Sequence, residues 1–364
     1  MSGKQPTSSD HARGEPLWRH FAMAGLVAAL LIPVLFFPPF RLIEARLYDI
    51  LSVISPPLPA QPGAVVVAID EPSIGEIGQR WPWSRELHAK LVESLRAAGA
   101  KVIAFDIIFA DPTTEKADTA FAKVLGPDVV LAADDVTTPL AQGIQVTRVS
   151  PLDPFLDAGA AIGVASVHLD GDAYLRRMPP AQESFAAEAL RLKGEPQASA
   201  PDGALIQYFG PARSYPTVYY YQALDPENFL PPGFFKDQTV LVGLSLKQAT
   251  SADIGAPDTF PTPYTLTEGT LTAGVEVQAT ILDNLRHNLY VLPVPPLVMV
   301  LLVVAGAFLA AAFSTHGVSW RTGLAAAFLV AFFFVGAWAV LRLGRVWASP
   351  ALPAAAALAV FGTR

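Results

Sequence analysis

Two aspartates that end buried apolar runs are the residues best placed for chemistry in this sequence. Asp70 lies at the end of GAVVVAIDE (63–71), and Asp106 lies within KVIAFDIIF (101–109). Continuous apolar runs of this kind are typical of parallel strands buried on both faces. Because ligands bind at the carboxyl ends of strands in open α/β sheets, we expect both carboxylates on adjacent strands of one binding edge.

Glu71 and Asp111 lie near these aspartates in the sequence and complete a candidate acidic cluster. Clustered carboxylates are suited to holding a divalent metal ion or to recognising a cationic ligand. The alternative is that aspartates at strand ends cap the following turns by accepting hydrogen bonds from backbone N–H groups. Both interpretations stay open, and the residue types identify neither a metal nor a cofactor.

Between the two apolar runs, Trp81-Pro82-Trp83 places two of the six Trp within three residues. Pro82 favours extended geometry at Trp81, so both indoles should lie on one side of the chain and cover the end of the sheet. Ser84 is a favourable helix N-cap. Arg85 and the indole N–H groups are expected to pair with Asp70 or Asp106, so this corner either holds a ligand or only seals the fold. The candidate ligand-binding residues are therefore Asp70, Glu71, Trp81, Trp83, Arg85, Asp106 and Asp111.

No catalytic motif accompanies these residues. The sequence has no phosphate-binding loop, zinc-protease helix, nucleophile elbow or dinucleotide-binding glycine pattern. The six His are scattered, and the absence of Cys excludes disulfides, thiolate metal sites and Cys nucleophiles. An enzymatic activity is therefore not assigned to this chain.

The elements that must position the candidate residues follow from hydrophobic periodicity. Leu87, Leu91 and Leu95 recur at helical spacing between the two apolar runs, which predicts a strand–helix–strand crossover. Further strands are predicted at 129–133, 162–167, 204–209 and 239–244, and helices at 116–125, 183–193, 217–224 and 274–286. Residues 250–272 indicate a surface loop. The predicted fold class is α/β, with a mixed, mainly parallel sheet flanked by helices, whose final helix leads into a membrane span.

The ends of the chain predict an all-α membrane part. Only 16% of the residues are charged, whereas soluble domains carry about 25%, and the deficit lies in apolar runs near both ends. A leader (1–20) precedes the first run, and residues 41–292 between the first and second runs form the predicted external domain. The predicted transmembrane helices are 21–40, 295–313, 323–341 and 346–362.

Charge distribution predicts the orientation and excludes one class of partner. Lys4, Arg13 and Arg19 in the leader favour a cytoplasmic N-terminus under the positive-inside rule, and four spans would place both termini there. The external domain would then be periplasmic in a bacterial inner membrane, in contact with membrane lipid. A net charge of −7 without clustered Lys or Arg excludes a nucleic-acid binder.

Several segments in their order along the chain resemble one family. VVVAIDEPSIGEIGQRWPWSRELHAKLVESLRAAGAKVIAFDIIFADP (65–112), IGVASVHLDGDAYLRRMP (162–179) and FPTPYTLTEGTLTAGVEVQATILDNL (260–285) together resemble the type-two CHASE domain, a cyclase and histidine-kinase associated sensory extracellular domain. The resemblance covers about 41–292, and three trailing spans are also typical of the family. The chain departs from the family pattern at Val164 and at Asp172-Ala173, which puts a ligand role for that segment in doubt.

The resemblance implies a receptor that binds an unidentified small molecule outside the cell and signals to a cytoplasmic output, most commonly an adenylate or guanylate cyclase. It also implies a homodimer. Since the sequence ends just after the last apolar run, the output is expected from a segment beyond residue 364 or from a partner protein. Two alternatives stay open, a membrane-anchored metal-dependent enzyme using Asp70 and Asp106 and a structural dimerisation domain.

Overall fold

The structure is a computed structural model that describes residues 16–56, 62–140, 142–180, 183–196, 199–246, 258–313 and 320–363. The chain forms two compact units. The membrane unit comprises Met1–Glu44, Val294–Val340 and Ala348–Arg364. The α/β unit comprises Ala45–Pro293 and Leu341–Trp347. Residues 1–15 of the predicted leader lie outside the described residues.

A mixed sheet forms the centre of the α/β unit. Its strands are β1 (Ala64–Ile69), β2 (Val102–Asp106), β3 (Val129–Leu140), β4 (Gly143–Val149), β5 (Ala161–Val164), β6 (Thr217–Tyr219) and β7 (Thr239–Leu244). The order is β4-β3-β2-β7-β1-β6, and β5 also pairs with β3. Every pairing is parallel except that of β3 with β4, which confirms the predicted mainly parallel sheet.

The register places β7 between β1 and β2. Val66 on β1 and Ala104 on β2 both pair with Leu241 on β7. The prediction that β1 and β2 are adjacent is therefore wrong. Strand order depends on a segment more than 100 residues further along the sequence, and periodicity within the first crossover carries no information about it.

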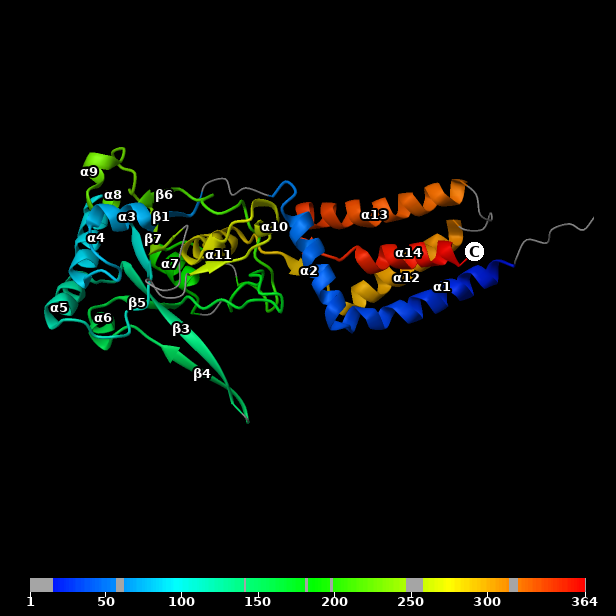
Figure 1. Ribbon diagram of the computed structural model, residues 1–364, viewed down its shortest axis with the longest axis horizontal. Helices are drawn as coiled ribbons and strands as arrows, with labels where there is room; N and C mark the ends of the chain where they lie inside the picture. Colours follow the sequence, from blue (N-terminus) through cyan, green and yellow to red (C-terminus); the bar gives the residue numbers. More distant parts are fainter. Residues whose placement is uncertain are drawn as a thin grey trace, which may run out of the picture. The chain divides into compact units, whose positions relative to one another are not determined.

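Helices cover both faces of this sheet (Figure 1). On one face, α4 (Arg85–Ala97), α5 (Glu115–Val124), α6 (Asp153–Asp157) and α8 (Tyr220–Leu224) pack against alternate strand residues such as Val65 and Val67. On the other face, α7 (Phe185–Lys193) and α11 (Gly274–His287) pack against residues of opposite parity such as Val66. Shorter elements are α3 (Glu71–Ile77), α9 (Pro226–Phe229), β8 (Thr259–Phe260), α10 (Thr265–Glu268) and β9 (Thr272–Ala273).

Three short segments differ from their predictions. Residues 204–209 form no strand, since only isolated bridges involve Leu205. Residues 217–224 form β6 and then α8 rather than one helix. Of the predicted loop 250–272, residues 250–257 lie outside the described residues, and the rest contains β8, α10 and the start of β9. Short apolar runs look alike in strand, helix and buried loop, so tertiary contacts decide among them.

The membrane unit contains α1 (Leu17–Leu31), the short 3₁₀ helix η1 (Ile32–Phe36), α12 (Pro296–Phe313), most of α13 (Trp320–Gly344) and α14 (Ala351–Gly362). In the described residues, three helical segments are long and apolar enough to cross a membrane: Trp18–Phe36, Pro296–Phe313 and Trp320–Gly344. The 12-residue α14 would extend only about 18 Å, against about 30 Å of hydrocarbon. The fourth span stays a prediction.

The segments through which the chain enters and leaves the α/β unit contact one another. Helix α2 (Pro38–Ser52) enters the unit, and β10 (Leu292–Pro293) pairs with β11 (Val346–Trp347). Tyr48 on α2 packs edge-on against Trp347, with ring centroids 5.4 Å apart. Helix α11 ends at His287, and the chain passes through β10 before the apolar helix Pro296–Phe313 begins, so the predicted final helix precedes the second apolar helix with a short strand between them.

Candidate functional site

The carboxyl ends of several strands enclose a cavity of about 400 Å³ in the α/β unit. We call it the carboxyl-edge cavity. It is lined by Trp81, Asp106, Ile107, Ile108, Asp134, Ala165, Ser166, Val167, Leu244, Asp258, Phe260, Gly274, Val277 and Gln278. The cavity therefore lies where α/β sheets generally bind ligands, and its volume is within the usual range of ligand pockets.

Asp106 is the last residue of β2 and lies on the face of the sheet covered by α11. Gly243 on β7 makes this position possible, because a Cβ there would be 2.8 Å from the Cβ of Val275 and 3.2 Å from that of Asp106. Burial raises the pKa of Asp106 well above its usual value, and the negative charge of Asp258 raises it further. The Asp106 carboxyl is thus an acid whose charged form is poorly compensated.

Asp258 lies at the N-terminus of α11. Its main-chain carbonyl accepts a hydrogen bond of 2.9 Å from the Gly274 N–H, and its carboxylate occupies the space that a Cβ on Gly274 would fill. Burial raises the pKa of Asp258 to about 6, and the charge of Asp134 contributes in the same direction. Asp258 therefore carries two carboxylate neighbours, Asp106 and Asp134.

Polar side chains on β3, just after β5 and on α11 complete the wall. The Ser166 hydroxyl donates to the Asp134 carboxylate and accepts a bond of 2.6 Å from the Asp135 N–H. The Gln278 amide donates to the Ala165 carbonyl at 2.8 Å. No Lys, Arg or His is among the described residues that line the cavity. Three carboxylates consequently share this wall without a lining counter-charge.

The two tryptophans are buried together, as their spacing predicts. Trp81 and Trp83 pack edge-on with centroids 5.4 Å apart, and Trp81 reaches the cavity. The Trp83 N–H donates to the main-chain carbonyl of Gln79 at 3.1 Å rather than to Asp70 or Asp106, so the expected acceptor is wrong. Trp81 therefore contributes to the site, and Trp83 supports it from the core.

Arg85 pairs with residues other than those predicted. Ser84 caps α4 through its side chain, accepting from the Glu86 N–H, and this places Arg85 in the first turn facing α5. Its guanidinium donates to the Asp118 carboxylate at 2.6 Å and to the main-chain carbonyl of Asp111. The acids at the strand ends are not its partners, because α4 packs on α5 across the opposite face of the sheet from α11.

Asp70 caps the helix that follows it. Its Oδ1 accepts from the Ser73 N–H at 3.1 Å and from the Ser73 hydroxyl at 2.8 Å. Burial raises its pKa, and its Oδ2 has no hydrogen-bond partner in the described part of the chain. Glu71 begins α3 with an exposed side chain, and the Asp111 side chain is also exposed. None of these three residues lines the carboxyl-edge cavity.

The predicted acidic cluster is therefore divided. Because β7 separates β1 from β2, Asp70 and Asp106 belong to strands about 10 Å apart. Within the residues that the structure describes, no group of three or more His, Asp or Glu could hold a metal ion. The acids that do gather around Asp106 are Asp134 and Asp258. Asp134 follows the apolar run VVLAA (129–133), so the strand-end pattern could have identified it, whereas Asp258 lies in a segment without such a pattern.

A second group of acids surrounds Arg176, only 1% of which is exposed. Its guanidinium bonds the Asp49 carboxylate through Nε at 2.6 Å and Nη2 at 2.7 Å. It also bonds Asp172 at 2.8 and 2.9 Å and Asp170 at 3.1 Å. Since Asp49 lies on α2, this group attaches the entering helix to the segment around Asp170. Sequence reasoning quoted Arg176 only as part of a motif and missed this role.

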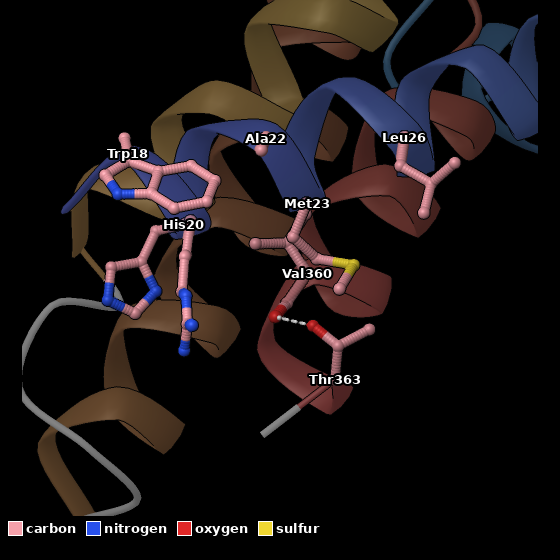
Figure 2. Close-up of a pocket in the computed structure, with 8 residues that line it drawn as sticks. Trp18, His20, Ala22, Met23, Leu26, Val360 and Thr363 are labelled. Atoms are coloured by element: carbon pink, nitrogen blue, oxygen red, sulfur yellow. Dashed lines mark hydrogen bonds between the residues drawn. The ribbon is translucent and has the colours of Figure 1, made fainter. Parts of the chain in front are cut away.

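The membrane unit has a cavity of its own, of about 480 Å³, between α1 and α14 (Figure 2). Trp18 and His20 lie at its polar end, and Met23 and Leu26 line its apolar part. The Thr363 hydroxyl donates to the Val360 carbonyl at 2.9 Å. Trp at the end of an apolar helix is typical of a membrane–water interface, and this cavity is consistent with such a position.

Comparison with protein families matches residues 26–313 to the model of the CHASE2 domain. The match begins within α1, covers the described part of the α/β unit up to β10 and ends with α12. Searches of curated proteins and of solved structures returned no match.

Proposed function

Since the chain belongs to the CHASE2 domain family, we propose that it is a membrane receptor that senses a small molecule outside the cytoplasm and signals to a cytoplasmic output. The CHASE2 domain is an extracellular sensory domain of signalling proteins, and the apolar helices fit a membrane protein. The observation that carries the proposal is that the family match runs from one apolar helix through the α/β unit to the next.

The carboxyl-edge cavity is the proposed input. It is the cavity of the α/β unit that lies at the ligand-binding edge of the sheet, and it is lined by groups whose charge is poorly compensated. Perturbed acids in a concave site are a common sign of function. The ligand-binding residues proposed from the structure are therefore Trp81, Asp106, Asp134 and Asp258.

The proposed relay uses the contacts at the entrance to the α/β unit. The β10–β11 pairing and the Tyr48–Trp347 contact join segments that continue into the membrane unit. A ligand that binds two conformations with different affinity would shift their populations, and these joined segments would move together. The proposed output is of the adenylate cyclase type, and the proposed location is a bacterial inner membrane with residues 41–292 in the periplasm.

A chimaera with an adenylate cyclase catalytic domain after Arg364 tests the relay. Cells that express it are expected to change their cyclic AMP about fivefold or more when the external medium contains the ligand, supplied first as low-molecular-mass fractions of conditioned medium. A cyclase that is active in the chimaera, yet insensitive to all such fractions, would contradict the relay. The matched control is the same cyclase on α1 alone.

Single-cysteine labelling tests the topology, because the chain has no Cys of its own. Gln145→Cys on the exposed strand β4 is expected to react with a membrane-impermeant maleimide in spheroplasts. Ser8→Cys in the leader and Thr363→Cys are expected to react only after lysis if there are four spans. Opposite behaviour of Ser8→Cys and Thr363→Cys would mean an odd number of spans.

Dimerisation is a second proposed role, favoured by the β3–β4 hairpin. Figure 1 shows this hairpin projecting from the rest of the α/β unit. It exposes Ile144 (73%), Val146 (60%) and Leu140 (54%), and such apolar side chains on an uncovered strand edge favour association. We propose that a second copy of the chain covers the hairpin. Disulfide cross-linking of Gln145→Cys would support this, and a monomer by light scattering in nanodiscs would contradict it.

A further inference from the structure

The wall of the carboxyl-edge cavity carries an excess of negative charge. Asp106, Asp134 and Asp258 all line it, the charge of Asp258 raises the pKa of Asp106, and the charge of Asp134 raises the pKa of Asp258. No described Lys, Arg or His lines the wall beside these acids. Elsewhere in the α/β unit, the acids around Arg176 have a cationic partner. A positive charge from outside would therefore be stabilised in the cavity.

The rest of the lining is apolar and aromatic. Ile107, Val167 and Phe260 are among the side chains that face the same space as the carboxylates. Trp81 provides an indole, the side chain that best attracts cations through its ring. A small molecule with an apolar body and a positive group would therefore contact the apolar side chains with its body and the carboxylates or the Trp81 indole with its positive group.

The acids are arranged for an organic cation rather than a metal ion. A bound divalent metal needs several oxygen ligands around one point, and no such group of three exists among the described residues. An ammonium group needs only one or two carboxylates at hydrogen-bonding distance. Carboxylates distributed along a wall suit a molecule that presents its charge at one end or at both ends.

We propose that the carboxyl-edge cavity binds an organic cation, a small molecule with one or two ammonium groups on an apolar body. Asp106 and Asp258 accept hydrogen bonds from the ammonium group, Trp81 packs against the apolar or cationic part, and Asp134 receives a second ammonium group where there is one. The role of this cation as the signal rests on the proposed receptor function, whereas its binding is tested independently.

The test uses the full chain in nanodiscs at constant ionic strength. The probes are 1,4-diaminobutane and benzylamine, and the matched neutral controls are 1,4-butanediol and benzyl alcohol. A probe at a hundredfold excess over its Kd is expected to raise the thermal midpoint of the α/β unit by about 5–10 °C. The neutral controls are expected to leave it unchanged. Equal shifts with amines and neutral controls, or shifts with MgCl₂ or CaCl₂ and not with amines, would overturn the proposal.

Substitutions locate the site. Asp106→Asn and Asp258→Asn are expected to weaken amine binding by calorimetry at least tenfold, and these variants should stay folded because each removes a repelling charge. Trp81→Phe, which keeps an aromatic ring, is expected to weaken it less. The matched control is Asp157→Asn, because Asp157 is exposed on α6 and outside the cavity.

Two failures are distinguishable. Unchanged amine affinity in folded Asp106→Asn and Asp258→Asn would overturn the proposed site. Amine binding that depends on these aspartates, combined with a cyclase chimaera that does not respond to the same amine, would leave the cation site standing and contradict the receptor function.

Discussion

Around Arg176, three carboxylates meet its guanidinium and those of Arg46 and Arg177. At the carboxyl-edge cavity, by contrast, three carboxylates line a wall that carries no described Lys, Arg or His. Both groups belong to the same α/β unit and use the same residue type. At Arg176 the buried charges are paired and hydrogen-bonded, so removing this cation leaves the buried Asp49 carboxylate poorly compensated. In the cavity no described Lys, Arg or His lines the wall, so a proton or a bound cation would relieve the repulsion between the carboxylates. The difference separates acids that hold the fold from acids available for binding.

Among these substitutions, removal of the Arg176 guanidinium is expected to have the largest effect on the free energy of unfolding. Arg176→Met should lower the free energy of unfolding by about 3–5 kcal/mol, because among the described residues it leaves the buried Asp49 carboxylate with only the longer, 3.5 Å contact to Arg46. Urea unfolding of the detergent-solubilised chain measures it. Arg177→Met is the matched control and should cost about 0–1 kcal/mol, since the Arg177 side chain is half exposed and pairs with Asp170. Equal losses of unfolding free energy in both variants would contradict the idea that the acids around Arg176 hold the fold through that buried cation.

Arg85 offers a second paired group with a more exposed acid. Arg85→Met is expected to lower the free energy of unfolding by about 2–3 kcal/mol, because Asp118 remains 18% exposed and keeps its bonds to Thr113. The same denaturation experiment measures it. A loss as large as that of Arg176→Met would show that pairing, rather than the depth of burial, sets the cost.

Removing a carboxylate from the carboxyl-edge cavity should change the free energy of unfolding in the opposite direction. Because burial and Asp134 raise the pKa of Asp258 to about 6 in the folded chain, the folded state holds this proton more tightly than the unfolded state. The contribution of Asp258 to stability is then fully present below the unfolded value near 4 and is lost as pH rises through about 6.

Asp258→Asn is accordingly expected to gain about 1–2 kcal/mol over the unmodified chain at pH 7.5, and the gain should shrink as the pH falls to 4. Thermal unfolding at a series of pH values measures the difference between the two chains, so that other titrating groups cancel. A variant that is less stable than the unmodified chain at pH 7.5 would mean that the Asp258 carboxylate is already compensated.

Exposed pairs should have the smallest effect. Arg148 on β4 bonds Asp135 and Glu183 at the surface, so Arg148→Ala is expected to change the free energy of unfolding by at most about 1 kcal/mol. The change should also diminish at 1 M salt. A loss comparable with that of Arg85→Met would contradict the small contribution expected of exposed pairs.

Patterns within short segments of the sequence predicted much of the fold. The apolar runs around Val66 and Ala104, the helical spacing of Leu91 and Leu95, and the Ser84 cap all reappear as elements of the structure, because each depends on neighbours within a few residues. Sequence reasoning failed where partners are distant. It paired Arg85 with the strand-end acids, and it grouped Asp70 with Asp106, although β7 lies between their strands.

The sequence by itself determined the class of protein. Apolar runs long enough for a membrane, a mainly parallel α/β pattern and the segments that resemble the family are all local properties, and the family match confirms the resemblance. Only the tertiary structure decided which acids act together. Strand order brings Asp134 to the same edge of the sheet as Asp106, contact with Gly274 places Asp258 there, and Asp70 is left to cap its own helix. Whether a carboxylate is paired depends on distances in space, and the linear sequence does not contain those distances.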